Sequence, residues 1–189
     1  LKQKEYPLEL FFCKDCSHVQ LTEVVNPKEL FENYVYVSGT SPLFVKHFEN
    51  YAKDIVKTYQ PSINNFILDI GSNDGTLLKF FKKMGYKTLG IDPAIDISKK
   101  AQKDGIDTIN DFFNLKNSRK IKAKYSEASL ITANNVFAHS DDLIEITKAV
   151  KNLLCPEGLF IFEVSYLLDV YQKTLFDTIY HEHLSYHSV

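Results

Sequence analysis

Apolar residues recur at steps of three and four positions along the segment that follows Ser41. The positions are Phe44, Phe48, Tyr51, Ile55 and Tyr59. This spacing places them on one face of a helix and leaves polar residues on the other. Ser41 and Pro42 suit the N-cap and the first helical position. The pattern therefore predicts an amphipathic helix that begins at these two residues and ends near residue 59.

After Pro61 the pattern changes to short apolar runs that alternate with helix-spaced segments. The apolar runs predict strands at residues 66–70, 87–92, near 108, 128–133 and 159–164. The remaining segments predict helices at residues 76–84, 98–103 and 141–154, with a turn at residues 156–158. Strands and helices that alternate at these lengths imply a mostly parallel sheet with helices on both faces. The expected fold class is therefore α/β and Rossmann-like.

Residues 1–40 show no sustained helical or strand period, and we expect them to form a small N-terminal appendage. Residues 41–189 hold the alternating pattern and form the second expected unit. A basic stretch at residues 116–124 lacks interleaved aromatic residues. We expect a solvated connection there and assign it no function.

Composition and charge narrow the classes of partner. The chain has 189 residues, of which 44% are hydrophobic, and a formal net charge of -2. This charge gives no overall attraction for a phosphate backbone or an anionic membrane, so we expect neither nucleic acid nor membrane as a partner. No apolar run reaches the roughly 20 residues that span a bilayer, and no signal-peptide pattern is present, so we expect a cytoplasmic protein. The sequence leaves the oligomeric state open.

The segment Asp69 to Gly75 follows the first predicted strand of the sheet, where ligands bind in open parallel sheets. Gly71 and Gly75 let the backbone turn sharply and approach a ligand, and the amides of the next helix offer donors. Asp92 ends the following strand, where a carboxylate can accept hydrogen bonds from both hydroxyls of a ribose. These features predict a nucleotide-like cofactor. Its predicted contacts are Asp69, Gly71, Ser72, Asn73, Gly75 and Asp92.

The same loop discriminates between two kinds of cofactor. It lacks the third glycine of the G-x-G-x-x-G pattern that binds a dinucleotide. Asp69 and Asp74 carry negative charge, which repels a pyrophosphate but attracts the positive aminocarboxypropyl tail and sulfonium of S-adenosylmethionine. We therefore expect S-adenosylmethionine, with a nicotinamide-dependent oxidoreductase as the alternative function.

Polar residues also follow the strand predicted at residues 128–133. Asn134 and Asn135 are expected at the binding edge of the sheet, where an amide can bind the cofactor or the acceptor. His139 follows them and is expected to reach an oxygen of the acceptor. The alternative is a loop of polar residues that satisfy one another.

Several segments occur in the order found in bacterial sugar C-methyltransferases, which act on nucleotide-linked keto-deoxysugars. They are Cys13 to Cys16 with His18 to Leu21, Tyr34 to Gly39, Asp69 to Gly75, Asn134 to His139, and Phe176 to Tyr186. The last segment, FDTIYHEHLSY, is the most specific match. The chain resembles this S-adenosylmethionine-dependent family along essentially its whole length, which implies a class I methyltransferase fold.

Members of that family have an N-terminal zinc-binding domain, a central methyltransferase domain and a C-terminal domain that helps to hold the nucleotide-sugar. Cys13 and Cys16 match one Cys-x-x-Cys pair of the zinc-binding domain, whereas a structural zinc site needs four ligands. The resemblance implies that the other pair precedes this chain and that the C-terminal domain follows it. We therefore expect a fragment with half of a structural zinc site.

C-methylation of a ketosugar requires removal of a proton next to the carbonyl, stabilisation of the enolate oxygen, and attack of the enolate on the methyl group. The resemblance implies that His183 is the base and that Tyr180, Glu182, His139 and Tyr34 surround the sugar. An imidazole suits the task because its ordinary pKa, near 6.5, leaves it largely neutral yet able to accept a proton. Glu182 remains an alternative base or a group that orients an imidazole.

Other assignments in this cluster stay open. Tyr180, Asn135 or a protonated His139 could donate to the enolate oxygen. Tyr180 and His183 share a face if their segment is helical, whereas His181 and His183 do so if it is extended. The cluster could instead bind a metal or be only structural. The whole chain could also be a non-catalytic module that retains affinity for the cofactor.

Overall fold

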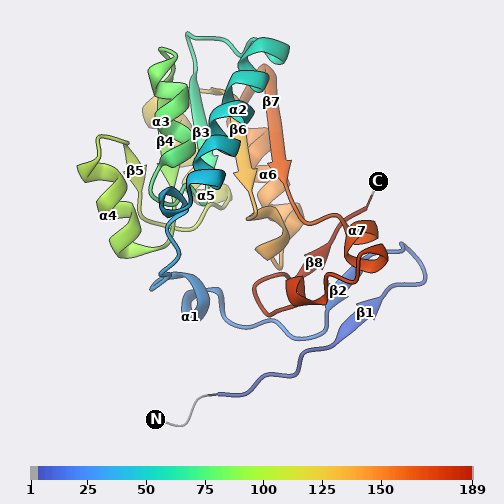
Figure 1. Cartoon of the computed structure of the whole chain (residues 1–189). Coiled ribbons are helices and arrows are strands. Elements are labelled where there is room, and N and C mark those ends of the chain that lie inside the picture. The colour runs from blue at the N-terminus through green and yellow to red at the C-terminus, as the bar shows by residue number, and fades with distance from the viewer. Residues whose placement is uncertain (1–3, 189) are drawn as a thin grey trace.

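A sheet of five parallel strands forms the centre of the computed structural model, which describes residues 4–188 (Figure 1). Its strands are β3 (Phe66–Ile70), β4 (Lys87–Ile91), β5 (Thr108–Ile109), β6 (Ala128–Asn134) and β7 (Leu154–Glu163), in the order β5-β4-β3-β6-β7. Every residue of β3 is buried, which explains why its sequence is apolar except for Asp69. The first strand of the sheet lies in its middle, and the predicted Rossmann-like α/β class is confirmed.

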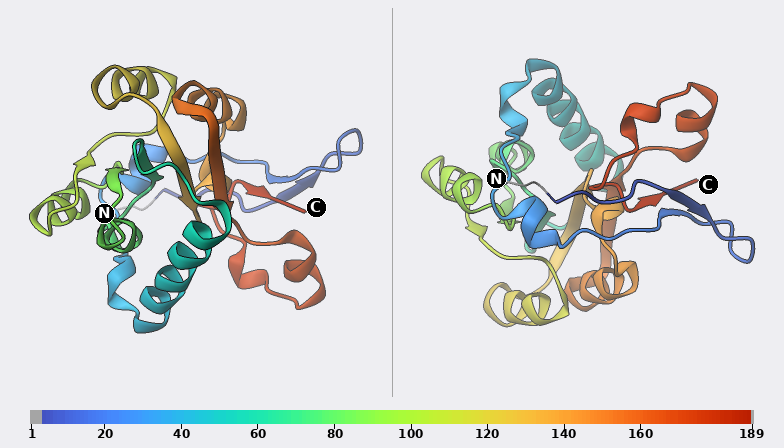
Figure 2. Two further views of the ribbon diagram at one scale, coloured as in Figure 1. Left: turned by 90° about the horizontal axis from the view of Figure 1, so that it is seen from above. Right: turned by 90° about the horizontal axis from the view of Figure 1, so that it is seen from below.

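Helices cover both faces of this sheet (Figure 2). They are α2 (Pro42–Tyr59), α3 (Thr76–Lys83) and α4 (Ile95–Lys103) on one face, and α5 (Leu115–Tyr125) and α6 (Leu143–Leu153) on the other. Ile67 and Leu130 pack with the first group, whereas Leu68 and Ile131 pack with the second, because neighbouring strand residues face opposite sides. No helix within the described residues is long and apolar enough to cross a membrane.

The long helix α2 confirms the prediction made from the first apolar pattern. Its N-cap is Ser41, whose hydroxyl accepts a hydrogen bond from the backbone N–H of Phe44 at 3.3 Å. Phe48, Ala52 and Ile55 are buried on the side that faces the sheet. The helix ends at residue 59, as its apolar spacing indicated.

A small antiparallel sheet lies at the carboxyl ends of the parallel strands (Figure 1). Its strands are β1 (Leu10–Phe12), β2 (Val19–Leu21) and β8 (Ser185–Tyr186), in the order β1-β2-β8. Because β8 comes from the far end of the chain, the predicted appendage at residues 1–40 shares a sheet with the predicted unit at residues 41–189. The residues 1–3 and 189 of those two ranges lie outside the described part of the chain.

Short helical segments complete the structure. They are α1 (Pro27–Phe31), α7 (Leu167–Gln172) and the 3-10 turns η1 (Ser38–Thr40), η2 (Phe137–His139) and η3 (Phe176–Thr178). Each 3-10 turn places one group in the site described below: Ser38 from η1, His139 from η2 and the carbonyl of Thr178 from η3.

The prediction of a solvated connection at residues 116–124 was wrong, because these residues form most of α5. The helix buries Ser118, whose hydroxyl donates to the carbonyl of Ala149 in α6 at 2.7 Å. A small polar residue at the interface lets the two helices approach closely, and Nζ of Lys122 donates to the carbonyl of Asn152 in α6 at 2.9 Å. A sequence rule that looks for large apolar residues misses such a contact.

The turn expected at residues 156–158 is also wrong in part, because these residues belong to β7. Leu154 pairs with Ala128 of β6, but the next pair along β7 joins Leu159 to Leu130. The residues between Leu154 and Leu159 therefore bulge out of the ladder, which accommodates Pro156 within the span of the strand. The helix predicted at residues 98–103 begins one turn earlier than expected, at Ile95.

Candidate functional site

A cavity of about 610 Å³ opens at the carboxyl ends of β3, β4 and β6. One side, which we call the cofactor half, is built by Asp69, Gly71, Ser72, Asn73, Asp92 and Asn134. The other side, which we call the acceptor half, is built by Tyr34, His139, Tyr180 and His183, with Glu182 behind them. The structure therefore brings most of the predicted site residues to one cavity.

The loop after β3 turns through a conformation that favours glycine. Gly71 has a φ of 65°, and a Cβ atom added there would collide with the side chain of Val136. Gly75 has a φ of 74° and is the N-cap of α3. Gly71 lines the cavity, whereas Gly75 does not. The backbone can therefore meet a ligand closely at Gly71, while Gly75 serves the turn into the helix.

Asp92 follows the end of β4 and presents its carboxyl group to the cavity. The carboxylate accepts hydrogen bonds from the backbone N–H groups of Asn73 and Ala94, both at 2.8 Å. Burial raises the pKa of this carboxyl above its ordinary value, and the two N–H groups oppose the rise. Asp92 thus holds a fixed acceptor at the cavity and ties together the loops that follow β3 and β4.

Asp69 lies in the middle strand of the sheet and is buried. Its Oδ1 atom accepts a hydrogen bond from the hydroxyl of Thr132 in β6 at 2.7 Å. Burial raises the pKa of Asp69 to about 7; the Thr132 hydrogen bond opposes this shift, and the charge of Asp92 adds to it. A cation bound nearby would favour the ionised form and reverse the shift.

Several buried polar atoms near Asp69 have no hydrogen-bond partner within residues 4–188. They are Oγ of Ser72, both amide atoms of Asn134 and Oη of Tyr51. Buried polar atoms ordinarily have partners, so these groups mark a place for a polar ligand. Their hydroxyl and amide groups, together with the two carboxylates and the glycine-lined wall, fit the ribose and aminocarboxypropyl groups of S-adenosylmethionine.

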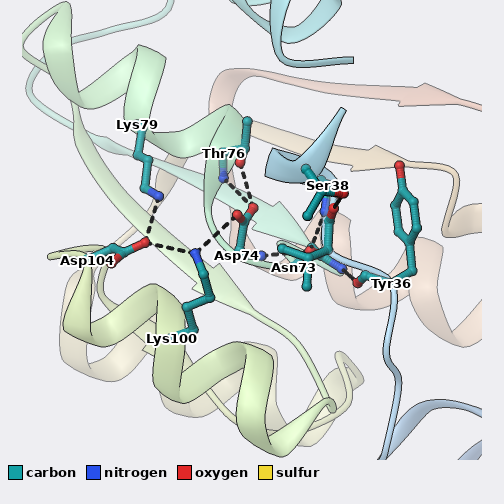
Figure 3. A network of polar contacts seen from close by, with 10 residues as sticks. Tyr36, Ser38, Asn73, Asp74, Thr76, Lys79, Lys100 and Asp104 are labelled. Atoms are coloured by element: carbon teal, nitrogen blue, oxygen red, sulfur yellow. Dashed lines mark hydrogen bonds and ion pairs between the residues drawn. The ribbon is translucent and has the colours of Figure 1, made fainter. Parts of the chain in front are cut away.

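Asp74 corrects part of the argument made from the sequence, because its side chain does not line the cavity and instead contacts Thr76 and Lys100 (Figure 3). Its Oδ1 atom accepts a hydrogen bond from the hydroxyl of Thr76 at 2.6 Å, and its Oδ2 atom lies 3.5 Å from Nζ of Lys100. The negative charge of Asp74 is therefore compensated outside the site. The preference for a cationic ligand over a pyrophosphate rests on Asp69 and Asp92 alone.

Asn135 lines the cavity, but its hydrogen-bonding groups are tied to the end of β7. Its backbone N–H donates to the carbonyl of Glu163 at 2.7 Å, and its side-chain amide donates to Oε1 of the same residue at 3.3 Å. The other carboxylate oxygen of Glu163 lies 2.8 Å from Nε2 of His47 in α2. These contacts favour a role for Asn135 in holding the loop, rather than the predicted contact with cofactor or acceptor.

The acceptor half joins residues from distant parts of the chain. The hydroxyl of Tyr34 donates to Oε2 of Glu182 at 3.0 Å, across 148 positions of sequence. Burial, followed by the charge of Glu182, raises the pKa of Tyr34, so its phenol stays protonated. Glu182 does not line the cavity. It therefore positions Tyr34 from behind.

The neutral ring of His183 is held in one tautomer by its two hydrogen bonds. Its Nδ1 atom lies 2.7 Å from the carbonyl oxygen of Thr178, which can only accept. Nδ1 must therefore carry a hydrogen, which leaves the lone pair of the neutral ring on Nε2. Nε2 lies 3.0 Å from the hydroxyl of Tyr180, which donates to it. The segment is a turn rather than a helix or strand, and it pairs Tyr180 with His183, while His181 contacts the carbonyl of Pro7 instead.

His139 is stacked between two rings. Its ring lies 5.4 Å from that of Phe31 and 5.2 Å from that of His183, measured between centroids. Burial, followed by the charge of His183, lowers the pKa of His139 to about 4. The proposed protonated His139 is therefore wrong near neutral pH. The neutral ring has a buried Nε2 atom without a partner in residues 4–188, which an acceptor oxygen or hydroxyl can meet.

Cys13 and Cys16 lie in the tight connection between β1 and β2. The backbone N–H of Cys13 donates to the carbonyl of His18 at 2.9 Å, which closes the turn. Backbone N–H groups of Cys16 and Asp15 lower the pKa of the Cys13 thiol, which favours the thiolate form that binds metals. Residues 4–188 contain no group of three or more side chains that could hold a metal ion. The two cysteines alone do not make a complete zinc site.

The sequence did not reveal three groups of this site. Tyr51 was predicted only as part of the apolar face of α2, and nothing in the pattern distinguished its hydroxyl. Phe31 stacks on His139, but an aromatic residue in an irregular segment gives no signal for that contact. The group of Thr178 that matters is a backbone carbonyl, which any residue would supply.

Comparisons with known proteins agree with this geometry. The family described as a methyltransferase domain matches residues 45–189, and a family described as a putative zinc binding domain matches residues 1–31. The C-methyltransferase NovU of Streptomyces niveus is 32% identical over 184 residues, which cover 97% of this chain and 44% of NovU. The chain thus spans less than half the length of this curated relative.

Solved structures share the fold at low sequence identity. A SAM-dependent methyltransferase from Archaeoglobus fulgidus has a TM-score of 0.59 and 18% identity, covering 77% of this chain and 67% of its own. The PH0226 protein of Pyrococcus horikoshii has a TM-score of 0.58 and 18% identity, covering 74% and 62%. The plantazolicin methyltransferase BpumL, solved in complex with SAH, has a TM-score of 0.56 and 17% identity, covering 76% and 55%. These similarities show a class I methyltransferase fold.

Proposed function

Because the chain belongs to the methyltransferase-domain family, we propose that it methylates a carbon atom of a nucleotide-linked keto-deoxysugar, with S-adenosylmethionine as the donor. The observation that carries this proposal is the lone pair on Nε2 of His183, which accepts a hydrogen bond from the hydroxyl of Tyr180 at the wall of the cavity. A base beside a donor suits the removal of a proton next to a ketone. The name of NovU, a C-methyltransferase, supports carbon as the methylated atom.

In this proposal the cofactor half holds S-adenosylmethionine. Asp92 accepts hydrogen bonds from the ribose hydroxyls, and Asp69, Ser72 and Asn134 bind the aminocarboxypropyl group. The bound cofactor supplies an electrophilic methyl group on a positively charged sulfur. The buried carboxyl of Asp69 supports a cationic group of the ligand, because positive charge close to Asp69 would favour its ionised form and offset the effect of burial.

His183 acts as the general base. Its Nε2 atom takes the proton from the carbon next to the ketone, and the electron pair of that C–H bond passes into the enolate. The ring then carries a positive charge while its Nδ1–H group still donates to the carbonyl of Thr178, a bond that strengthens when the donor is charged. The position of Glu182 behind Tyr34 favours His183 over Glu182 as the base.

Tyr180 is the donor for the enolate oxygen. Burial, followed by the charge of Glu182, raises the pKa of Tyr180, so its hydroxyl keeps its proton near neutral pH. An acceptor that enters between Tyr180 and His183 replaces their mutual hydrogen bond with one bond to each. The neutral ring of His139 stacks behind His183 and offers Nε2 to a second oxygen of the sugar.

The direct test is incorporation of deuterium into the acceptor. A thymidine-diphosphate-linked keto-deoxysugar is incubated in D₂O with the chain saturated with S-adenosylhomocysteine, and the carbon next to the ketone is followed by proton NMR. His183 should exchange that hydrogen well above the uncatalysed rate, because proton removal does not require methyl transfer. A chain that binds S-adenosylhomocysteine but shows no exchange above buffer would contradict the proposed base and carbon acceptor.

Calorimetric titration separates this function from a nicotinamide-dependent oxidoreductase. S-adenosylhomocysteine should bind, whereas a nicotinamide dinucleotide should not, because its pyrophosphate would lie against Asp69 and Asp92. Tighter binding of the dinucleotide would reverse the assignment of the cofactor half.

A further inference from the structure

The two halves of the cavity are connected through one residue of the loop after β3. Asn73 has a φ of 51°, in the left-handed region, and its side chain leaves the loop toward residues 34–40 (Figure 3). Its Oδ1 atom accepts a hydrogen bond from the backbone N–H of Ser38 at 2.9 Å, and its Nδ2 group donates to the carbonyl of Tyr36 at 2.9 Å. We call residues 34–40 the N-terminal strap. The side chain of Asn73 thus joins the cofactor loop to this strap.

The strap has few other polar connections to the rest of the chain. Within residues 4–188, its backbone bonds are local, such as those from Tyr34 to Phe31 and from Thr40 to Val37. Apart from its contacts with Asn73, the strap is hydrogen-bonded to a distant element within residues 4–188 through Tyr34, which donates to Glu182. The strap nevertheless forms part of the cavity wall. Its position therefore depends strongly on Asn73.

Close packing supports the same attachment. Gly39 lies against the cofactor loop, and a Cβ atom added there would come within 2.5 Å of Oδ2 of Asp74 and 2.9 Å of the hydroxyl of Thr76. Asp74 cannot easily move away, because Thr76 and Lys100 hold its carboxylate. A side chain at residue 39 would push the strap off the loop without any change to Asn73.

Asn73 also contacts the residue expected to bind the ribose. Its backbone N–H donates to the carboxylate of Asp92, while its side chain holds the strap that carries Tyr34. We propose that Asn73 is a positioning residue that fixes the strap on the cofactor loop, so that cofactor bound at Asp92 orders the acceptor half. This inference rests on the proposed function for its ligands. It changes the predicted role of the Asn73 side chain from binding cofactor to holding the strap.

Hydrogen exchange of backbone amides tests the attachment without turnover. Asn73→Gly removes both bonds to the strap, together with the bond that Oδ1 accepts from the backbone N–H of Asp74, yet glycine tolerates the left-handed backbone and keeps the N–H that donates to Asp92. The Ser38 amide should exchange about tenfold faster in Asn73→Gly than in the wild-type chain, because it loses a buried hydrogen-bond acceptor. Saturation with S-adenosylhomocysteine should slow this exchange in the wild-type chain but not in the variant.

Steady-state kinetics give a second readout. Asn73→Gly should raise the KM for the keto-deoxysugar about tenfold, because the strap is no longer ordered before the acceptor binds. Its affinity for S-adenosylhomocysteine should change less than threefold, which a general loss of folding would not allow. Gly39→Ala should also raise the KM for the keto-deoxysugar, because its added methyl group pushes the strap away from the cofactor loop. Thr40→Val is the matched control, because the Thr40 hydroxyl bonds only within the strap, to the carbonyl of Val37.

Equal exchange of the Ser38 amide in the wild-type chain and in Asn73→Gly would overturn the inference, whatever the ligand. An unchanged KM for the sugar in both Asn73→Gly and Gly39→Ala would also overturn it. Failure of S-adenosylhomocysteine to bind the wild-type chain would instead contradict the proposed function, while the exchange comparison of the unliganded proteins would still decide the role of Asn73.

Discussion

The cofactor half and the acceptor half of the cavity are made from different kinds of structure. In the cofactor half, Asp69, Asp92 and Asn134 lie within or directly after three neighbouring parallel strands. In the acceptor half, Tyr34 and His183 come from irregular segments near opposite ends of the chain. The first set is held by the ladder of the sheet, whereas the second is held by single side-chain contacts such as that between Tyr34 and Glu182.

This difference separates two tasks. A cofactor that returns in every cycle benefits from a rigid site, which regular elements provide. An acceptor must enter, lose a proton and leave, so a site on loops can adjust without disturbing the core. Changes in the acceptor half should therefore affect chemistry more than folding or cofactor affinity, and changes in the cofactor half should do the reverse.

The largest expected effect is on catalysis, from His183→Gln. Loss of the Nε2 base should reduce kcat for sugar methylation by about a thousandfold. Affinity for S-adenosylhomocysteine should stay within twofold, because His183 lies in the other half of the cavity. The measurement is methyl transfer to the keto-deoxysugar, together with calorimetry.

His181→Gln provides a matched control for that change. His181 lies two positions away in the same turn, but its ring contacts the carbonyl of Pro7 rather than the cavity. We expect its kcat to stay close to that of the wild-type chain. A similar loss in both variants would mean that the turn is needed for structure rather than for proton transfer.

A smaller effect, confined to the cofactor half of the cavity, is expected from Asp92→Ala. The affinity for S-adenosylhomocysteine should fall about a hundredfold, because hydrogen bonds to a buried charged acceptor are lost. Asp96→Ala is the control, since Asp96 is an exposed acidic residue of the adjoining helix. Calorimetry measures both. Equal affinity for the two variants would remove Asp92 from the cofactor site.

The smallest effect is a dependence of binding on pH that arises from Asp69. With a pKa of about 7 in the free chain, Asp69 is mostly protonated at pH 6 and mostly ionised at pH 8. The ammonium group of S-adenosylhomocysteine favours the ionised form of a carboxyl close to it, so affinity for this ligand should rise about tenfold between these pH values. Calorimetry in buffers of different ionisation enthalpy should also detect proton release on binding. Asp69→Asn should abolish both the rise and the release.

Proton linkage predicts the opposite pH trend for the contribution of Asp69 to the free energy of unfolding of the unliganded chain. The folded chain keeps a proton on Asp69 up to about pH 7, whereas the unfolded chain loses it near the ordinary value of 3.8. At this site the folded state therefore binds more protons in this range, so the contribution of Asp69 to the free energy of unfolding should fall as the pH rises from 4 to 7. His139, whose pKa is lowered to about 4, contributes with the opposite sign in the same range. Urea titrations of the wild-type chain and of Asp69→Asn isolate the Asp69 contribution, and an equal pH dependence in both would place the pKa of Asp69 near its ordinary value.

Periodicity predicted the strands that position the cofactor half. The strands that end near Asp69, Asp92 and Asn134 are short apolar runs, and a parallel sheet brings their carboxyl ends to one edge. Periodicity could not show in which direction the side chains of the loop after β3 point. Asp74 and Asn73 follow each other in sequence, yet one pairs with Lys100 and the other with the strap.

Apart from His139, which was also expected from its place after a strand, the acceptor half was predicted only from the resemblance. The contact between Tyr34 and Glu182 joins positions whose local patterns contain no information about each other. The tautomer of His183 depends on the backbone carbonyl of Thr178, and a residue of any type at position 178 would supply that carbonyl. The missed helix α5 has a similar cause, because its interface uses the hydroxyl of Ser118 where an apolar residue is expected.

The pairing of β2 with β8 has a consequence for the order in which this protein matures during synthesis. The strands from β3 to β7 and their helices can emerge from a ribosome and assemble while the last residues are still being made. The sheet that joins Gln20 to Ser185 must wait for the end of the described chain, as must the imidazole of His183. A nascent chain would thus complete the cofactor half of the cavity before the acceptor half.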